Sequence, residues 1–339
     1  MVEPPGRGES KKIDGRELLR LGSRGQQVIL LRDRLAAFGF PSEDDPQGQF
    51  GDSTYCAVRS FQESRGLRVD GICGPQTWSS LAEAGFGLGD RLIVLKSPML
   101  RGDDVAELQQ RLGELGFDTG RVDGIFGPET SSALAQFQRN VGLVPDGIFG
   151  KASAAELDRL SIRGGGPSLM AEVKERELLR QSPRTLDGQT ITIGYDPGLE
   201  KLVGKVTAIL KNVGANVSMD CEPDGSTQAK VANLASASLH LSFSLNDGET
   251  GFSMAYYSGF KFESAVGKAL AQSIQDRLSA IVPARDSHPL GMALPVLRET
   301  RMTAVSCDMG SHVANEGQLG LMAQAIFDAL VSWASETWD

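Results

Sequence analysis

An internal repeat is the feature that most constrains how this chain can fold. The segment 24–40 returns as 101–117 with its glycines and apolar positions kept, and the segment 50–74 returns as 126–150. A sequence that repeats itself builds the same small structural unit again, so repeats are sought before any other pattern. The first half of the chain is therefore expected to hold two copies of one small domain.

Each copy is expected to form three short helices. Apolar residues at three- and four-residue spacing share one helical face. In the first expected helix these are Val28, Leu31, Leu35 and Phe38. Gly39 then ends this helix, because glycine takes a positive φ at little cost. A second helix is expected to end at Arg65-Gly66, and a third to begin at Pro75, where proline fits the first helical turn.

An Asp-Gly-Ile turn recurs in the two copies. It opens at Asp70 in the first copy and at both Asp123 and Asp146 in the second. Asp-Gly is turn chemistry, because aspartate caps nearby amides and glycine supplies a positive φ. Cys73 stands where the second copy has Phe149, which favours a small buried apolar role for this thiol.

The second copy resembles the peptidoglycan-binding domain of the PGB1 type, a three-helix module found in many cell-wall hydrolases. The positions that match its pattern are Gly102, Val105, Leu108, Gln109, Leu112, Asp123, Gly124, Phe126, Gly127, Thr130, Ala133, Phe137, Gln138, Gly142, Asp146 and Gly147. The first copy departs from the pattern by carrying Gln47-Gly48-Gln49-Phe50-Gly51 in place of the first Asp-Gly turn and by inserting 43–45. The resemblance implies peptidoglycan fragments or precursors as ligands.

Five residues of the repeats are candidates for ligand binding. They are Trp78, Asp70, Asp123, Asp146 and Phe126. The Trp78 ring could stack on a sugar or peptide, and the carboxylates could accept from the amine of a stem peptide. The alternatives are a core role for Trp78 and a turn-capping role for the carboxylates.

The second half of the chain has the pattern of an α/β domain. Strands are expected at 190–195, 215–219, 239–245, 252–257 and 304–308, and helices at 201–212, 230–236, 264–278 and 319–333. Strands that alternate with helices favour a mostly parallel sheet. The expected organisation is a disordered N-terminus (1–16), two peptidoglycan-binding-like domains (17–88 and 92–162), a linker (163–185) that includes a solvated helix over 169–181, and the α/β domain (186–335).

This half resembles the zinc-dependent N-acetylmuramoyl-L-alanine amidases of the Amidase_3 family. The resemblance rests on segments 188–198, 214–217, 237–246 and 297–310, followed by Asn315. It implies an amidase-like fold in which two histidines and one glutamate hold zinc, which activates water, while a further glutamate shuttles protons.

The four functional positions of that family are all changed in this chain. The first histidine is replaced by Leu199, and the second by Ser244. The glutamate ligand is left with Glu200 as its only acidic candidate, and the catalytic glutamate has become Asp308. The domain is therefore expected to lack zinc and to have no catalytic residues.

Three histidines could in principle replace the lost ligands. His240 lies four residues before Ser244 on the same expected strand, which places it about 13 Å away at roughly 3.3 Å per residue. A relocated site built from His288, His312 and Asp308 is the alternative. Because a catalytic zinc needs three converging ligands, solvent-facing or core roles are favoured for these histidines.

Composition excludes several classes of partner. The net charge of −9 over 339 residues disfavours binding to nucleic acid or to an anionic membrane surface. No run of residues reaches the roughly 18–20 apolar positions of a membrane span. The start of the chain shows no apolar secretory segment, and the four cysteines form no Cys-x-x-Cys pair, so reduced thiols and a cytoplasmic location are expected.

The order of domains, two peptidoglycan-binding-like repeats followed by an amidase-like domain, resembles that of the CwlM-type regulators of actinobacteria. That resemblance implies a non-catalytic regulator of cell-wall precursor synthesis whose partners include the cytosolic enolpyruvyl transferase and the lipid II flippase. Two other functions stay open. One is an active or residual amidase that degrades peptidoglycan, and the other is an adaptor that acts through its repeats alone.

Overall fold

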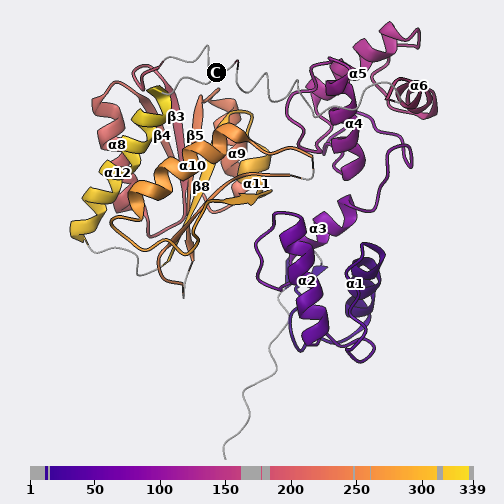
Figure 1. Cartoon of the computed structure of the whole chain (residues 1–339), viewed down its shortest axis with the longest axis horizontal. Coiled ribbons are helices and arrows are strands. Elements are labelled where there is room, and N and C mark those ends of the chain that lie inside the picture. The colour runs from indigo at the N-terminus through magenta and orange to yellow at the C-terminus, as the bar shows by residue number, and fades with distance from the viewer. Residues whose placement is uncertain are drawn as a thin grey trace, which may run out of the picture.

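A computed structural model describes residues 12, 13, 16–161, 177, 184–246, 249–259, 261–310 and 316–335. A two-stranded hairpin of β1 (Lys12–Ile13) and β2 (Arg16–Glu17) precedes two groups of three helices (Figure 1). The first group is α1 (Gln26–Ala37), α2 (Asp52–Ser64) and α3 (Pro75–Glu83), and the second is α4 (Asp103–Glu114), α5 (Pro128–Asn140) and α6 (Lys151–Ser161). The three helices expected for each copy are therefore confirmed.

Each copy has a core of its own, and the two cores use equivalent side chains. In the first copy the rings of Phe40 and Phe61 meet edge to face at 5.8 Å, and in the second Phe117 and Phe137 do the same at 5.8 Å. Cys73 is buried in the first core, as expected. The repeated sequence thus encodes the same packing twice.

The first turn of the first copy keeps its glycine, since Gly48 has a φ of +70° as Gly124 does, and the insertion lies beside it. Asp45 lies within this insertion, and its carboxylate accepts from the backbone amides of Gly51 at 3.0 Å and Thr54 at 2.7 Å. These amides begin helix α2 and have no partner within the helix. The inserted aspartate therefore caps α2, and the different first turn leaves the three-helix fold unchanged.

The second half forms a six-stranded sheet in the order β4-β3-β5-β8-β6-β7. Its strands are β3 (Thr190–Tyr195), β4 (Asn216–Cys221), β5 (Leu239–Asn246), β6 (Phe252–Tyr257), β7 (Leu290–Met292) and β8 (Thr303–Gly310). All neighbouring pairs are parallel except β6 with β8. The chain therefore has the expected fold class, two helical peptidoglycan-binding-like units followed by an α/β domain with a mostly parallel sheet.

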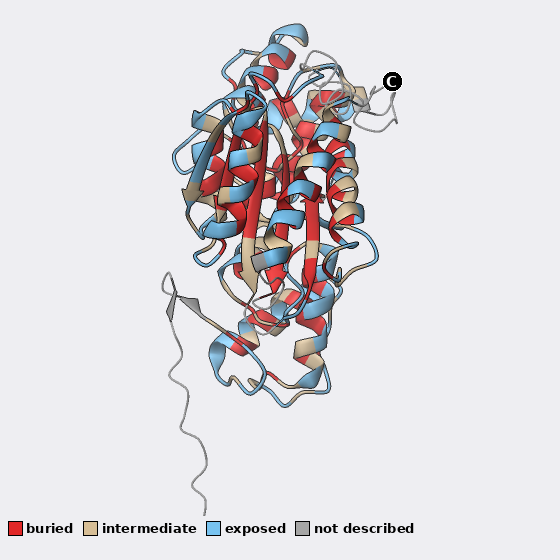
Figure 2. Cartoon of the chain, turned by 90° about the vertical axis from the view of Figure 1, so that its left-hand side faces the viewer, coloured by how far each residue is buried: buried red, intermediate tan, exposed pale blue. Residues whose placement is uncertain are grey.

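Helices cover the sheet on both faces. Helix α12 (Glu316–Ser335) packs against both α8 (Glu200–Asn212) and α10 (Ala265–Leu278) on one face (Figure 1). The short α11 (Pro295–Arg298) packs against α9 (Gly225–Leu234) on the other. Strands β3, β5, β6 and β8 are largely buried between these layers (Figure 2), whereas the edge strands β4 and β7 are not.

Tertiary context accounts for the differences from the expected elements. The sequence of β5 alternates apolar and polar residues, but its first five residues are all buried because the strand lies in the middle of a covered sheet. Helix α9 begins at Gly225, five residues earlier than expected, since the Asp224 side chain caps it by accepting from the Thr227 amide at 2.8 Å. The expected helix over 169–181, apart from Glu177, lies outside the described residues, and the domain boundaries stay predictions.

The second repeat packs against the face of the sheet that α9 and α11 also cover. Ala106 of α4 and Val122 pack in one buried cluster with Ala255, Tyr257 and Ala304 from strands β6 and β8. The hydroxyl of Tyr257 donates to the carbonyl of Val122 at 3.2 Å. The second repeat is therefore packed onto the sheet rather than held only by the linker.

Candidate functional site

The positions that the amidase resemblance assigns to zinc chemistry lie at the carboxyl ends of three adjacent strands. Strand β5 lies between β3 and β8, and all three run parallel. Ser244 stands directly opposite Asp308 in the register of β5 with β8. Strand ends of this kind are where open α/β sheets bind ligands. The fold therefore brings Ser244 and Asp308 together at the expected place.

The carboxylate of Asp308 is held by three donors. The Ser244 hydroxyl donates to Oδ1 at 3.1 Å, and the Asn246 amide donates to Oδ2 at 3.2 Å. Nη2 of Arg285 donates to Oδ2 at 2.8 Å and to the Asp308 carbonyl at 2.6 Å. Charge-assisted bonds of this kind are the stronger class, so the guanidinium neutralises the carboxylate where the family places its proton-shuttling glutamate.

The other two positions have structural roles. Leu199 is buried and belongs to the main core of the α/β domain. Both carboxylate oxygens of Glu200 accept from the Gly198 amide, at 3.0 and 3.1 Å, and this hydrogen bond lowers the pKa of Glu200. Glu200 thus stabilises the turn into helix α8, where a negative charge also favours the helix N-terminus.

His240 lies apart from the strand-end site. Its Nδ1 is 2.8 Å from the Thr192 hydroxyl, and its Nε2 is 3.4 Å from Oε1 of Gln228. Burial lowers the pKa of His240 to about 4, so the imidazole is neutral at pH 7. His288 is exposed in the loop before β7, and His312 and Asn315 lie outside the described residues.

The residues at the strand ends do not fit a zinc ion. Ser244 and Leu199 offer no ligand, and the Asp308 carboxylate already carries a cationic partner in Arg285. The other carboxylate at these strand ends, that of Asp196, accepts from the Leu245 amide at 2.8 Å. Across the described ranges, no group of three or more His, Cys, Asp and Glu residues is placed to hold a metal ion. A tetrahedral zinc site needs three protein ligands that converge.

In the repeats, a buried glutamine organises each of the three Asp-Gly turns. Gln62, Gln109 and Gln138 donate from Nε2 to Asp70, Asp123 and Asp146 respectively, each at 2.9 Å. Their Oε1 atoms accept from the glycine amide that follows each aspartate, at 2.8 to 2.9 Å. These glycines have φ between +67° and +70°, which explains why glycine is needed there.

The three turns differ in their surroundings. Asp70 and Asp146 are exposed, whereas the α/β domain covers the turn of Asp123. Burial raises the pKa of Asp123, while the backbone amide of Ile148 lowers the pKa of Asp146. The three turns have nearly the same sequence, but the tertiary structure places them in different surroundings.

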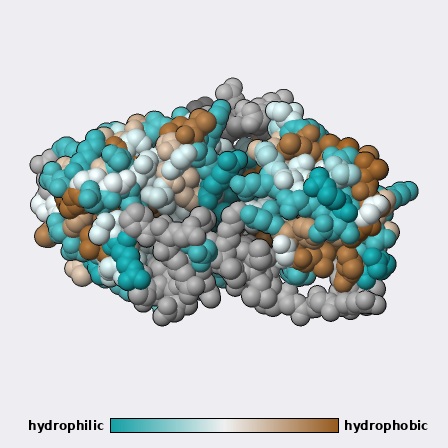
Figure 3. Space-filling model, turned by 90° about the horizontal axis from the view of Figure 1, so that it is seen from above, coloured by the Kyte–Doolittle hydropathy of each residue, from teal (hydrophilic) through white to brown (hydrophobic). Residues whose placement is uncertain are grey.

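The aromatic candidates lie in the cores of the repeats. Trp78 is 4% exposed within the first core, and Phe126 is fully buried in the second. Apolar side chains that do reach the surface of the second repeat include Leu92 and Val144, and hydrophobic residues appear on the lobe formed by the repeats (Figure 3). Ligand binding by the five candidate residues stays a prediction.

Sequence reasoning missed the partners of these residues. Arg285 lies 23 positions from Asp308, in a loop that no motif marks. The glutamines were visible as positions shared by the repeats, since Phe61-Gln62 recurs as Phe137-Gln138. A buried polar residue kept in both copies, beside a turn, was the signal that could have found them.

The fold and these turns define a protein with two peptidoglycan-binding repeats and an amidase-like α/β domain. Residues 24–81 and 101–157 match the family described as "Putative peptidoglycan binding domain". The chain is 34% identical over 352 residues to N-acetylmuramoyl-L-alanine amidase CwlM of Mycobacterium tuberculosis, an alignment that spans 92% of this chain and 86% of that protein. The chain belongs to the CwlM family.

Other similar proteins share only part of the chain. N-acetylmuramoyl-L-alanine amidase CwlL of Bacillus licheniformis is 34% identical over 173 residues, 45% of this chain and 48% of that protein. The solved amidase AmiC2 of Nostoc punctiforme covers 44% of this chain and 99% of its own, with a TM-score of 0.37 and 16% identity. None of the described helices has the length and apolarity needed to cross a bilayer.

Proposed function

We propose that this chain is a non-catalytic regulator of peptidoglycan precursor synthesis that acts by binding proteins or precursors. The observation that carries the proposal is the contact between Arg285 and Asp308, at 2.8 Å, at the strand ends where the family's catalytic chemistry lies. A fixed positive charge beside this carboxylate stabilises its ionised form and so weakens it as a proton acceptor, which zinc-dependent hydrolysis requires.

Hydrolysis of an amide by this class of enzyme needs a metal-activated water and a base to move its proton. The hydroxyl of Ser244 donates to Asp308, so this pair forms a closed hydrogen-bonding unit with Arg285. Leu199 contributes its side chain to the core. These contacts support a domain that retains the amidase-like fold for recognition.

The repeats supply the binding surface in this proposal. The turns of Asp70 and Asp146 are exposed, and peptidoglycan fragments or precursors are the ligands that their family implies. The α/β domain would bind protein partners, for which the CwlM resemblance suggests the enolpyruvyl transferase and the lipid II flippase. A cytoplasmic location, where precursors are made, is part of the same proposal.

The test measures catalysis and binding on the same full-length protein. Purified chain is incubated with muropeptides in the presence of zinc, and peptide release is followed by chromatography. Binding of the enolpyruvyl transferase and of a soluble peptidoglycan precursor is measured in parallel by calorimetry. The proposal expects no peptide release and a saturable complex. Zinc-dependent release would contradict it, and so would the absence of any complex with either a precursor or the transferase.

An amidase is the second candidate, because the similar proteins carry that name. Under this alternative, Asp308 serves as the base and Arg285 moves away when substrate binds. Asp308→Asn would then abolish peptide release while leaving the fold intact. Arg285→Lys would change the pH profile of the rate, since the carboxylate would face a different cation.

A further inference from the structure

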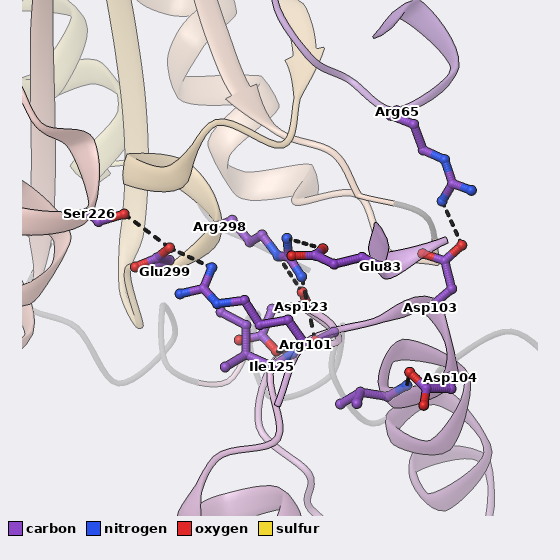
Figure 4. A network of polar contacts seen from close by, with 12 residues as sticks. Arg65, Glu83, Arg101, Asp103, Asp104, Asp123, Ile125, Ser226, Arg298 and Glu299 are labelled. Carbon is purple, nitrogen blue, oxygen red and sulfur yellow. Dashed lines mark hydrogen bonds and ion pairs between the residues drawn. The ribbon is translucent and has the colours of Figure 1, made fainter. Parts of the chain in front are cut away.

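The segment 292–300 of the α/β domain lies between the two repeats. Its amide of Ala293 donates to the carbonyl of Gly66, at the end of helix α2, at 2.7 Å. Its Arg298 contacts Glu83 of the first repeat and the turn of Asp123 in the second (Figure 4). A single short segment of the sheet domain thus holds both repeats.

Arg298 is the centre of this contact. Nη1 donates to Oε2 of Glu83 at 2.8 Å, and Nε donates to the carbonyl of Asp123 at 2.6 Å. The side chains of Arg298 and Glu83 are each only 17% exposed. A buried ion pair of this kind is costly to break, because each partner would be left without a counter-charge in a poorly solvated place.

The flanking residues extend the same contact. Glu299 pairs with Arg101 of the second repeat at 2.7 Å and also accepts from the hydroxyl of Ser226 at 3.2 Å. Arg121, just before the turn, donates to the carbonyls of Leu297 at 3.2 Å and Thr300 at 2.7 Å. These polar bonds surround a buried apolar cluster in which Val296 and Leu297 meet Val122 of the second repeat.

The other two Asp-Gly turns serve as internal references. All three have the same glutamine network, but among the described residues only the Asp123 turn has its outward carbonyl bound by an arginine of the α/β domain. Adding a Cβ at Gly124 would place it 3.1 Å from Nη2 of Arg298, which shows how closely the guanidinium is seated. The Asp70 and Asp146 turns stay exposed.

We propose that the segment 292–300 is a built-in occupant of the second repeat, and that Arg298 closes the Asp123 turn to ligands until the α/β domain moves away. In this closed state the repeats bind through the Asp70 and Asp146 turns alone. Release of Arg298 opens a third, equivalent turn, which couples what the α/β domain binds to what the repeats can bind. Only the identity of the ligand rests on the function proposed above.

The closed contact is tested without ligand by hydrogen exchange of the full chain. Arg298→Ala is compared with Arg159→Ala, a matched control whose arginine pairs with Glu156 on the far helix α6. Arg298→Ala is expected to speed exchange of the segments 121–127 and 292–300 together by at least about tenfold, since breaking a buried pair costs several kcal/mol. The segment 144–150 and the control variant should not change.

Two results would overturn the closed contact. One is unchanged exchange at 121–127 in Arg298→Ala, and the other is equal acceleration at 144–150. If Arg298→Ala fails to fold, Arg298→Gln decides the question, because it keeps part of the side-chain stem but removes the guanidinium that bonds the Asp123 carbonyl. Exchange at 121–127 should then rise, whereas no rise contradicts the proposal.

A soluble disaccharide-peptide fragment of peptidoglycan extends the test to binding. With wild-type chain, protection is expected at 67–73 and 144–150 but not at 121–127, and Arg298→Ala should add protection at 121–127. Protection at 121–127 in the wild type would overturn the closed state. Absence of protection everywhere would contradict the proposed ligand, while the exchange rates without ligand still decide whether the turn is closed.

Discussion

Nη2 of Arg285 lies 2.8 Å from Oδ2 of Asp308, so a guanidinium holds the carboxylate at the strand end where amidase relatives are expected to move protons. The same nitrogen bonds the Asp308 carbonyl at 2.6 Å. One side chain therefore ties the loop after helix α10 to strand β8. Whatever the domain binds at this edge of the sheet meets an internally neutralised pair.

Removal of Arg285 should destabilise the α/β domain. In Arg285→Ala the Asp308 carboxylate keeps only the uncharged donors Ser244 and Asn246. Hydrogen bonds to charged groups contribute about 1.5–3 kcal/mol, so the free energy of unfolding should fall by roughly that amount. Urea denaturation measures the change, and Arg285→Lys should recover part of it. An unchanged midpoint in Arg285→Ala would show that the ion pair is not formed in solution.

The buried glutamines should matter more for the repeats than neighbours outside the turn network. Gln109→Ala leaves the Gly124 amide without its acceptor and removes one donor of the Asp123 carboxylate, which keeps the Ile125 amide, at a cost of about 1–3 kcal/mol for buried polar groups. Gln110→Ala is the matched control, since that side chain bonds only Glu114 on the same helix. Thermal unfolding should shift for the first variant and hardly at all for the second. Equal shifts would contradict the turn network.

His240 should make stability fall in weak acid. Its folded-state pKa of about 4 lies below the ordinary value of 6.5, so the unfolded chain binds the proton more tightly. The stabilisation is fully present above about pH 6.5 and is lost as the pH falls towards 4, by roughly 3 kcal/mol at 1.36 kcal/mol per pKa unit.

Denaturation midpoints between pH 4 and 7 measure this dependence. His240→Gln should flatten the curve, because it removes the titrating group from the contact with Thr192. His288→Gln is the control, since His288 is exposed, and it should leave the curve unchanged. A slope that persists in His240→Gln would assign the acid sensitivity to other groups.

The pKa values of Asp123 and Asp146, in the two turns of the second repeat, should be shifted in opposite directions. Burial raises the pKa of Asp123, so the charged form costs stability as the pH rises through that raised value. The Ile148 amide lowers the pKa of Asp146, so its contribution is present above the ordinary pKa and is lost as the pH falls. Carboxyl carbon shifts in NMR titrations measure both groups directly. A pKa for Asp123 at or below that of Asp146 would contradict the docked α/β domain.

Local patterns in the sequence were sufficient for most of the fold. The strand limits 190–195 and 252–257 match β3 and β6, and Gly39 and Pro75 mark the end and the start of helices as expected. These features depend on neighbours along the chain, which a periodicity records directly.

Features that depend on contacts between distant parts of the chain could not be predicted from local sequence patterns. Strand β7 and helix α11 are too short to show a period. The antiparallel pairing of β6 with β8 depends on which strands become neighbours in the sheet, and local sequence does not record this. The resemblance predicts from the sequence that Leu199 and Ser244 stand at zinc-ligand positions, but the ion pair between Arg285 and Asp308 could not be predicted. Likewise, nothing in the second repeat marks Asp123 as the turn that another domain covers.

Zinc content decides whether the strand ends hold the pair of Arg285 and Asp308 instead of a metal. Full-length chain is equilibrated with equimolar zinc, dialysed, and measured by inductively coupled plasma mass spectrometry. Arg285→Ala is measured beside it. The zinc content of the wild type should stay at background level. One tightly bound zinc per wild-type chain, removed by a chelator, would contradict it.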